Sequence, residues 1–138
     1  MDETPLAIVL FSGTDDKLNA AAVMASGAAA LGRPVHVFLQ YWGLDAFRAD
    51  RIKLDHGLAT EAGAEGRSAV DALRAAGQAP WYETFAMAKE LGNVEIQACS
   101  LSMDLLRISE SDLDPLVDGT EGVTAFYIAV GDGQILFI

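Results

Sequence analysis

The chain has 138 residues, 51% of them hydrophobic and 21% charged, a balance that fits one compact domain rather than a disordered segment. Nine lysine and arginine residues against 20 aspartate and glutamate residues give a formal net charge of −11, which disfavours binding to nucleic acid or to anionic membranes. No apolar run reaches the roughly 20 residues of a membrane span, and the acidic residues 1–5 are unlike the basic start of a signal peptide.

Two apolar runs of strand length lie near the start of the chain, at residues 6–11 and 35–39. Continuous apolar runs of this length are typical of strands that are buried on both faces of a parallel sheet. Residues 12–16 supply a turn and candidate N-caps, and an alanine-rich helical pattern then continues to about Leu31. This strand–helix–strand unit predicts a right-handed crossover between parallel strands.

Residues 48–79 have a different composition, because charged residues, glycines and alanines replace the apolar runs. Within this segment, residues 67–76 have the composition of a helix. We expect the whole segment to be a mobile insertion or lid with weak secondary structure, inside a single domain that spans residues 1–138.

The second half of the chain again alternates between helical and strand patterns. A helix is predicted over residues 81–91, and strands are predicted over residues 94–98 and 134–138. Four apolar residues at helical spacing predict a further helix: Val123, Phe126, Tyr127 and Val130. Strands and helices that alternate in this way predict an α/β protein, a three-layer sandwich with a mainly parallel, flavodoxin-like sheet of about five strands.

Three loops follow the carboxyl ends of predicted strands, at residues 12–16, 41–44 and 99–104. In open parallel sheets, ligands bind beyond the carboxyl ends of the strands. We therefore expect these loops to converge on one edge of the sheet and to form the functional site there.

Cys99 is the only cysteine in the chain, and it follows directly on the predicted strand at residues 94–98. Helix-start residues come next, so the thiol is expected at a helix N-terminus, where free N–H groups and the helix dipole stabilise a thiolate. The thiolate is the nucleophile, whereas the alternative interpretation is a buried, inert cysteine. A lone cysteine excludes disulfide oxidoreductase or two-cysteine peroxidase chemistry within one chain, and it indicates a cytoplasmic protein.

The residues after the cysteine have structural interpretations beside functional ones. Ser100 and Ser102 are expected to cap the following helix, with hydroxyl groups that are also able to donate to sulfur. Met103 is expected in the core, and Asp104 in the first helical turn, where the dipole stabilises a carboxylate without any catalytic duty.

The loop at Ser12, Gly13 and Thr14 permits two interpretations, an anion-binding nest or a simple turn with an N-cap. Trp42, which precedes Gly43, either walls a pocket or packs on the sheet edge. No G-x-G-x-x-G or P-loop pattern is present, and the two histidines and the cysteine lack metal-ligand spacing. The sequence therefore predicts neither a metal nor a cofactor.

Three features of the sequence carry a family resemblance. They are a Ser-Gly-Thr turn at residues 12–14, a Trp-Gly-Leu corner at residues 42–44 and the sequence Ala-Cys-Ser-Leu-Ser-Met-Asp-Leu-Leu at residues 98–106. In these features the chain resembles the DsrE/DsrF-like family, whose members include sulfur-relay proteins. The resemblance covers nearly the full length except residues 48–79. Arg107 stands where related sequences commonly have glycine.

That resemblance implies a cytoplasmic α/β domain, often a homo-oligomer, in which Cys99 carries sulfane sulfur as a persulfide. The protein would be a carrier with sulfurtransferase-like chemistry, and its sulfur donors and acceptors would be other proteins or small thiols. The residues expected to form the binding site around the thiol are Ser12, Gly13, Thr14, Trp42, Gly43, Ser100, Ser102 and Met103.

Two other functions remain open at this point. One is a non-catalytic module that binds a small ligand, such as a nucleotide or a flavin, in a pocket beside Trp42. The other is a structural subunit of an oligomer, in which the cysteine is incidental. Apolar residues near the end of the chain are suited to cover an interface in any oligomer: Tyr127, Ile128, Phe137 and Ile138.

Overall fold

The computed structural model describes residues 4–138. Residues 1–3, which belong to the acidic N-terminal stretch on which the signal-peptide expectation rests, lie outside the described residues. Within residues 4–138, no helix has both the length and the apolar character needed to cross a membrane.

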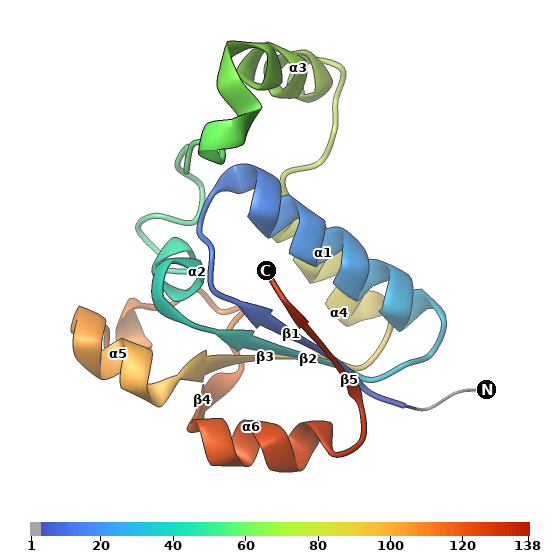
Figure 1. Cartoon of the computed structure of the whole chain (residues 1–138), viewed down its shortest axis with the longest axis vertical. Coiled ribbons are helices and arrows are strands. Elements are labelled where there is room, and N and C mark those ends of the chain that lie inside the picture. The colour runs from blue at the N-terminus through green and yellow to red at the C-terminus, as the bar shows by residue number, and fades with distance from the viewer. Residues whose placement is uncertain (1–3) are drawn as a thin grey trace.

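A five-stranded sheet in the order β4-β3-β2-β1-β5 forms the centre of the protein, and every paired strand runs parallel to its neighbour (Figure 1). This confirms the predicted α/β class and the size of the sheet. All residues of β1 and β2 are buried, as their largely apolar sequences predict, and His36 is the one polar residue among them. The strands are β1 (Leu6–Leu10), β2 (Val35–Leu39), β3 (Val94–Cys99), β4 (Gly119–Glu121) and β5 (Gln134–Phe137).

Helices form the outer layers of the sandwich. Figure 1 shows α1 and α4 together on one face of the sheet and α6 on the opposite face. The helices are α1 (Asp15–Ala30), α2 (Tyr41–Ala46), α3 (Gly63–Ala75), α4 (Trp81–Leu91), α5 (Ser100–Leu106) and α6 (Val123–Val130), and short 3-10 turns lie at η1 (Thr60–Ala62) and η2 (Glu110–Asp112).

The face under α1 and α4 is tightly packed. Alanines of α1 let it lie close to α4 and to the sheet, and Gly92 approaches Ala29 so closely that a Cβ there would be 3.0 Å from the Ala29 carbonyl oxygen. Phe85 of α4 and Leu18 of α1 are fully buried in this layer. Because both helices and the sheet contribute to one continuous core, this face is complete within the chain.

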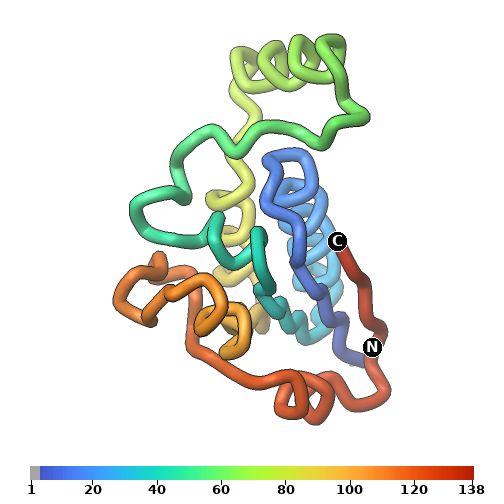
Figure 2. The backbone as a smooth tube through the Cα atoms, turned by 60° about the vertical axis from the view of Figure 1, so that its left-hand side comes forward, coloured from blue at the N-terminus to red at the C-terminus, as the bar shows by residue number. Residues whose placement is uncertain are grey.

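The face under α6 is thinner. Only Phe126 and Val130 of that helix are buried, and Phe126 stacks on Phe38 of β2 with ring centroids 4.7 Å apart. Figure 2 shows α6 on the far side of the sheet from α1 and α4. Five other large apolar side chains of α6 and β5 are exposed: Val123, Tyr127, Ile128, Ile135 and Phe137.

Three local features differ from the sequence-based expectations. The three residues of β4 form a strand that the sequence pattern did not predict. The Trp-Gly-Leu corner lies within a short helix, α2, rather than in an irregular loop. The helix expected over residues 67–76 begins earlier, at Gly63, so the segment 48–79 has more secondary structure than expected.

Candidate functional site at the carboxyl edge of the sheet

The three expected loops do meet at one edge. Because β1, β2 and β3 are adjacent and parallel, the segments that follow them leave the sheet side by side. Helix α5 after β3 packs against α2 after β2 through a buried contact, in which the Tyr41 N–H donates to the Ser102 hydroxyl oxygen at 3.1 Å. Tyr41 has a left-handed backbone (φ 44°), and its hydrogen bond to Ser102 helps to hold that turn.

Two glycines allow the first two loops to touch. A Cβ on Gly13 would lie 2.3 Å from the Trp42 carbonyl oxygen, and one on Gly43 would lie 2.2 Å from the Leu10 carbonyl oxygen. The Gly43 N–H donates to the Phe11 carbonyl at 2.9 Å. These contacts give both glycines a packing role, because any larger residue would force the loops apart.

The loop after β1 is a turn that leads into α1. The Ser12 N–H donates to the carbonyl of Ile138 at 3.1 Å, which ties the loop to the end of the last strand. Thr14 is the N-cap residue in extended conformation, although its side chain makes no capping bond to the helix backbone. The geometry therefore agrees with the turn and N-cap interpretation of this loop.

Cys99 is the last residue of β3 and the N-cap residue of α5, as the sequence predicts. Its side chain is 4% exposed and belongs to the small cluster on the α6 face, with Val9, Phe38 and Phe126 among its members. None of the eight expected binding residues belongs to that cluster. The thiol is therefore covered by the α6 side of the protein rather than open toward Trp42.

The residues of α5 have different positions from those expected. The helix begins at Ser100, so neither serine caps it, and Ser102 is buried and accepts the hydrogen bond from Tyr41. Met103 packs in the larger core on the α1–α4 face and accepts a hydrogen bond from the Thr120 hydroxyl at 3.4 Å, which confirms its core role. Asp104 is exposed and lies beyond the first turn.

A histidine–carboxylate pair lies beside the cysteine on the same face. Glu121 of β4 is the register partner of Cys99, so the two side chains project from neighbouring strand positions to one side of the sheet. The Nε2 atom of the buried His36 hydrogen-bonds to the Glu121 carboxylate, and Glu95 lies 3.7 Å from its other ring nitrogen. This contact was not predictable from sequence patterns, because β4 is only three residues long and has no strand pattern.

Trp42 is 57% exposed and lies beside Tyr41, with ring centroids 6.2 Å apart. A cavity of about 580 Å³ lies elsewhere, and it is lined by Trp81 rather than by Trp42. In residues 4–138, no group of three or more histidine, cysteine, aspartate or glutamate side chains is arranged to hold a metal ion.

Comparison with known proteins gives a consistent result at the level of family and fold. A family model described as DsrE/DsrF/DrsH-like matches residues 2–65. The uncharacterized protein YrkE of Bacillus subtilis is 31% identical over 154 aligned residues, which cover 95% of this chain and 94% of YrkE.

Two solved structures share the fold. One is the protein of unknown function MTH1491 from Methanobacterium thermoautotrophicum, with a TM-score of 0.52 and 15% identity over 97% of this chain and 98% of that chain. The other is the ychN protein from E. coli, with a TM-score of 0.57 and 13% identity over 99% of this chain and 100% of that chain. At these identities the likeness concerns the fold alone.

Proposed function

The chain belongs to the DsrE/DsrF/DrsH-like family, and from that premise we propose that it carries sulfane sulfur as a persulfide on Cys99. The observation that supports this most is the position of the only cysteine, at the carboxyl end of β3 and the N-cap of α5. A helix start has backbone N–H groups without partners in the helix, and their positive dipole end favours an anionic form of a nearby sulfur, whether thiolate or persulfide.

The proposed chemistry is an exchange without net oxidation or reduction. The Cys99 thiolate attacks the outer sulfur of a donor persulfide, a new S–S bond forms, and the S–S bond of the donor breaks and releases the donor thiolate. In the second step, an acceptor thiolate attacks the outer sulfur on Cys99 and leaves the Cys99 thiolate behind. No second cysteine exists in the chain, so donor and acceptor are other proteins or small thiols.

A neighbouring carboxylate opposes a sulfur anion on Cys99, and its histidine partner reduces that repulsion. A carboxylate at the position of Glu121 repels a nearby sulfur anion, and the hydrogen bond with His36 draws charge away from that carboxylate. We propose that the His36–Glu121 pair positions the wall of the sulfur site, without itself touching the transferred atom.

Access to the thiol requires movement of its cover. Because Cys99 is 4% exposed and Phe126 lies in the same cluster, reagents reach the sulfur when α6 shifts away from the sheet. Such a shift is favoured on this face, since α6 is held by only two buried side chains.

We further propose that the protein is a homo-oligomer in the cytoplasm. The exposed apolar side chains of α6 and β5 form the surface for the contact, with Ile128 at 77% and Phe137 at 68% exposure. A second copy on this surface would also limit access to the sulfur. The lone cysteine fits a reducing compartment.

Intact-mass measurement of the native protein after incubation with a persulfide donor tests the proposal. The expected result is a gain of about 32 Da per added sulfur atom on the wild type and none on Cys99→Ser. A second variant, His36→Gln, leaves the thiol in place but removes the partner of Glu121, and it should load more slowly than wild type. Absence of the gain on native wild type, with alkylation of Cys99 only after unfolding, would contradict the proposal and favour an incidental cysteine.

A further inference from the structure

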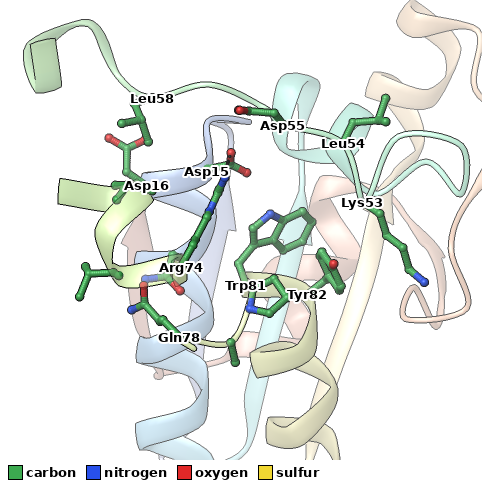
Figure 3. A pocket seen from close by; sticks show the side chains of 15 residues that line it. Asp15, Asp16, Lys53, Leu54, Asp55, Leu58, Arg74, Gln78, Trp81 and Tyr82 are labelled. Atoms are coloured by element: carbon green, nitrogen blue, oxygen red, sulfur yellow. Dashed lines mark hydrogen bonds and ion pairs between the residues drawn. The ribbon is translucent and has the colours of Figure 1, made fainter. Parts of the chain in front are cut away.

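A cavity of about 580 Å³ lies between the N-terminal ends of α1 and α4, the loop at residues 53–58 and α3 (Figure 3). Its volume is within the range of about 300–1,000 Å³ found for small-molecule sites. Cys99 and the loops at residues 12–14 and 42–44 do not line it. The cavity is thus a separate feature from the proposed sulfur site.

Helix α3 closes one side of the cavity. No residue of α3 is buried, yet its apolar residues Val70 and Leu73 line the cavity, and Leu73 is 50% exposed. Two ion pairs tie the helix down, Arg74 to Asp15 at 3.0 Å and Arg67 to Asp55 at 3.3 Å. An apolar helix face that meets a cavity instead of a packed core is suited to contact a ligand.

The opposite wall is aromatic and comes from the start of α4. Trp81 and Tyr82 both line the cavity, with their ring centroids 5.6 Å apart in an edge-to-face arrangement. Figure 3 shows the Trp81 indole next to the Asp15–Arg74 pair. Aromatic faces beside carboxylates are the combination that recognises organic cations in proteins.

The charged groups of the cavity are mainly acidic. Three carboxylates line it, those of Asp15, Asp16 and Asp55. Burial raises the pKa of Asp16, but hydrogen bonds from the Ala59 and Lys17 N–H groups help to outweigh it, so the pKa lies below its usual value. The Gly57 N–H likewise lowers the pKa of Asp55.

Two of these carboxylates already have a cationic partner. Arg74 pairs with the buried Asp15, and Arg67 of α3 pairs with Asp55. Lys53 is exposed, and Figure 3 shows its ammonium group directed away from Asp15 and Arg74. Among the three carboxylates, Asp16 is therefore the one that forms no ion pair with these cations, and it lies on the same cavity as the aromatic wall, where it attracts a cation.

We propose that this cavity binds a small organic cation, an amine or a guanidine with an apolar body. The cationic group pairs with Asp16, and the apolar body lies between Leu73 of α3 and the Trp81–Tyr82 wall. Arg74, whose guanidinium already pairs with Asp15, shows the kind of group that a carboxylate of this wall accepts. A phosphate in the same place would be repelled by the Asp16 carboxylate.

Fluorescence titration of the full-length Trp42→Phe variant tests the proposal, because it leaves Trp81 as the only tryptophan. The probes are phenethylamine, phenylacetate, which has an apolar body of similar size and the opposite charge, and adenosine monophosphate. Saturable binding of phenethylamine is expected below about 5 mM, and no binding of the two anions at that concentration.

Variants in the same background identify the site. Asp16→Asn should weaken phenethylamine binding about tenfold, as expected when one charge-assisted hydrogen bond is lost. Asp104→Asn, an exposed carboxylate on α5, should leave it unchanged, and Cys99→Ser should bind as tightly as its parent. Equal binding of phenylacetate, binding of adenosine monophosphate, or no saturable binding of the amine would overturn the proposal. Because Cys99→Ser cannot carry sulfur, these outcomes are independent of the sulfur-carrier proposal.

Discussion

On one face of the sheet, α1 and α4 bury a continuous layer in which Leu18 and Phe85 are fully enclosed, whereas on the other face α6 buries only Phe126 and Val130. On the first face, helices of the same chain cover the apolar surface of the sheet. The second leaves large apolar side chains in solvent, among them Ile128. The proposed reactive residue, Cys99, lies on this second face.

On the proposed function, stability and reactivity belong to different faces of the sheet. The tightly packed face holds the strands and their loops in place, while α6, which buries only two of its side chains, covers the thiol and is proposed to move without loss of the fold. Movement on the α6 face is thus compatible with a rigid sheet.

The largest expected effect is the loss of packing under α4. Phe85→Ala should lower the free energy of unfolding by about 4–5 kcal/mol, because a fully buried ring is removed from a core with little room to collapse. Phe126→Ala should cost less, about 3 kcal/mol, because α6 is free to settle onto the sheet. Urea denaturation measures both.

The same two variants differ in the chemistry of the thiol. Phe126→Ala should increase the rate of Cys99 alkylation in the native protein at least about tenfold, since it removes a cover of the sulfur. Phe85→Ala should leave that rate near the wild-type value in the absence of urea. The opposite ranking would show that the α6 face is not the route to the thiol.

Next in size is the effect of a charge on the exposed α6 surface. Ile128→Glu should shift the oligomer toward monomer, because an unpaired carboxylate would be buried in the contact. Leu91→Glu places the same charge on an exposed apolar site at the end of α4 and should leave the mass unchanged. Sedimentation velocity measures the mass of both variants and of the wild type. A wild type that is already monomeric would contradict the oligomer proposal.

A smaller effect is expected where the segment at residues 48–79 is tied to α1. Asp16 accepts hydrogen bonds from the Ala59 N–H at 3.2 Å, and its folded pKa lies below the usual value. Its stabilisation is therefore complete above about pH 4 and is lost as the pH falls through the folded pKa. Asp16→Asn should lower the free energy of unfolding by about 1 kcal/mol at neutral pH.

Thermal unfolding at neutral and acidic pH provides the measurement. The difference between Asp16→Asn and wild type should shrink as the pH falls below the usual aspartate pKa and should disappear below the lowered folded pKa of Asp16. Asp104→Asn serves as a control with no expected change at either pH. A difference that persists at low pH would show that the carboxylate charge is not the cause.

The smallest predicted effect is a gain. Arg107 ends α5 with a left-handed backbone (φ 55°), a position that favours glycine. Arg107→Gly should raise the free energy of unfolding by about 0.5–1 kcal/mol, because it relieves the strain but adds freedom to the unfolded chain. Urea denaturation with unchanged slope would confirm it, whereas a loss of stability would mean that the arginine side chain makes a contact of greater value.

Strong, continuous patterns made the sheet predictable. The apolar runs of β1 and β2 and the helical spacing in Val123–Val130 all correspond to the observed elements. The position of Cys99 between strand and helix was predictable for the same reason, since a β-branched run ends there and helix-start residues follow. Local chemistry was enough in these cases because it agrees with the final packing.

Features that depend on tertiary contacts were not predictable. Ser102 has the composition of a cap but bonds to Tyr41 of another loop. Cys99 has Glu121 as its strand neighbour because β4 pairs with β3, and the three residues of β4 carry no strand signal. Likewise, the cavity beside Trp81 forms where the start of α1, the loop at residues 53–58, α3 and the start of α4 come together, an arrangement that periodicity does not reveal.

The most direct test of the central claim is discharge of the loaded protein. Wild type loaded with one sulfur atom is separated from the donor and incubated with a small thiol, while intact mass is followed with time. If Cys99 is a sulfur carrier, the protein loses about 32 Da and one equivalent of small-molecule persulfide appears, and the loss is faster for Phe126→Ala. A loaded protein that keeps its sulfur in the presence of excess thiol, in both wild type and Phe126→Ala, would contradict the assignment of Cys99 as a sulfur carrier.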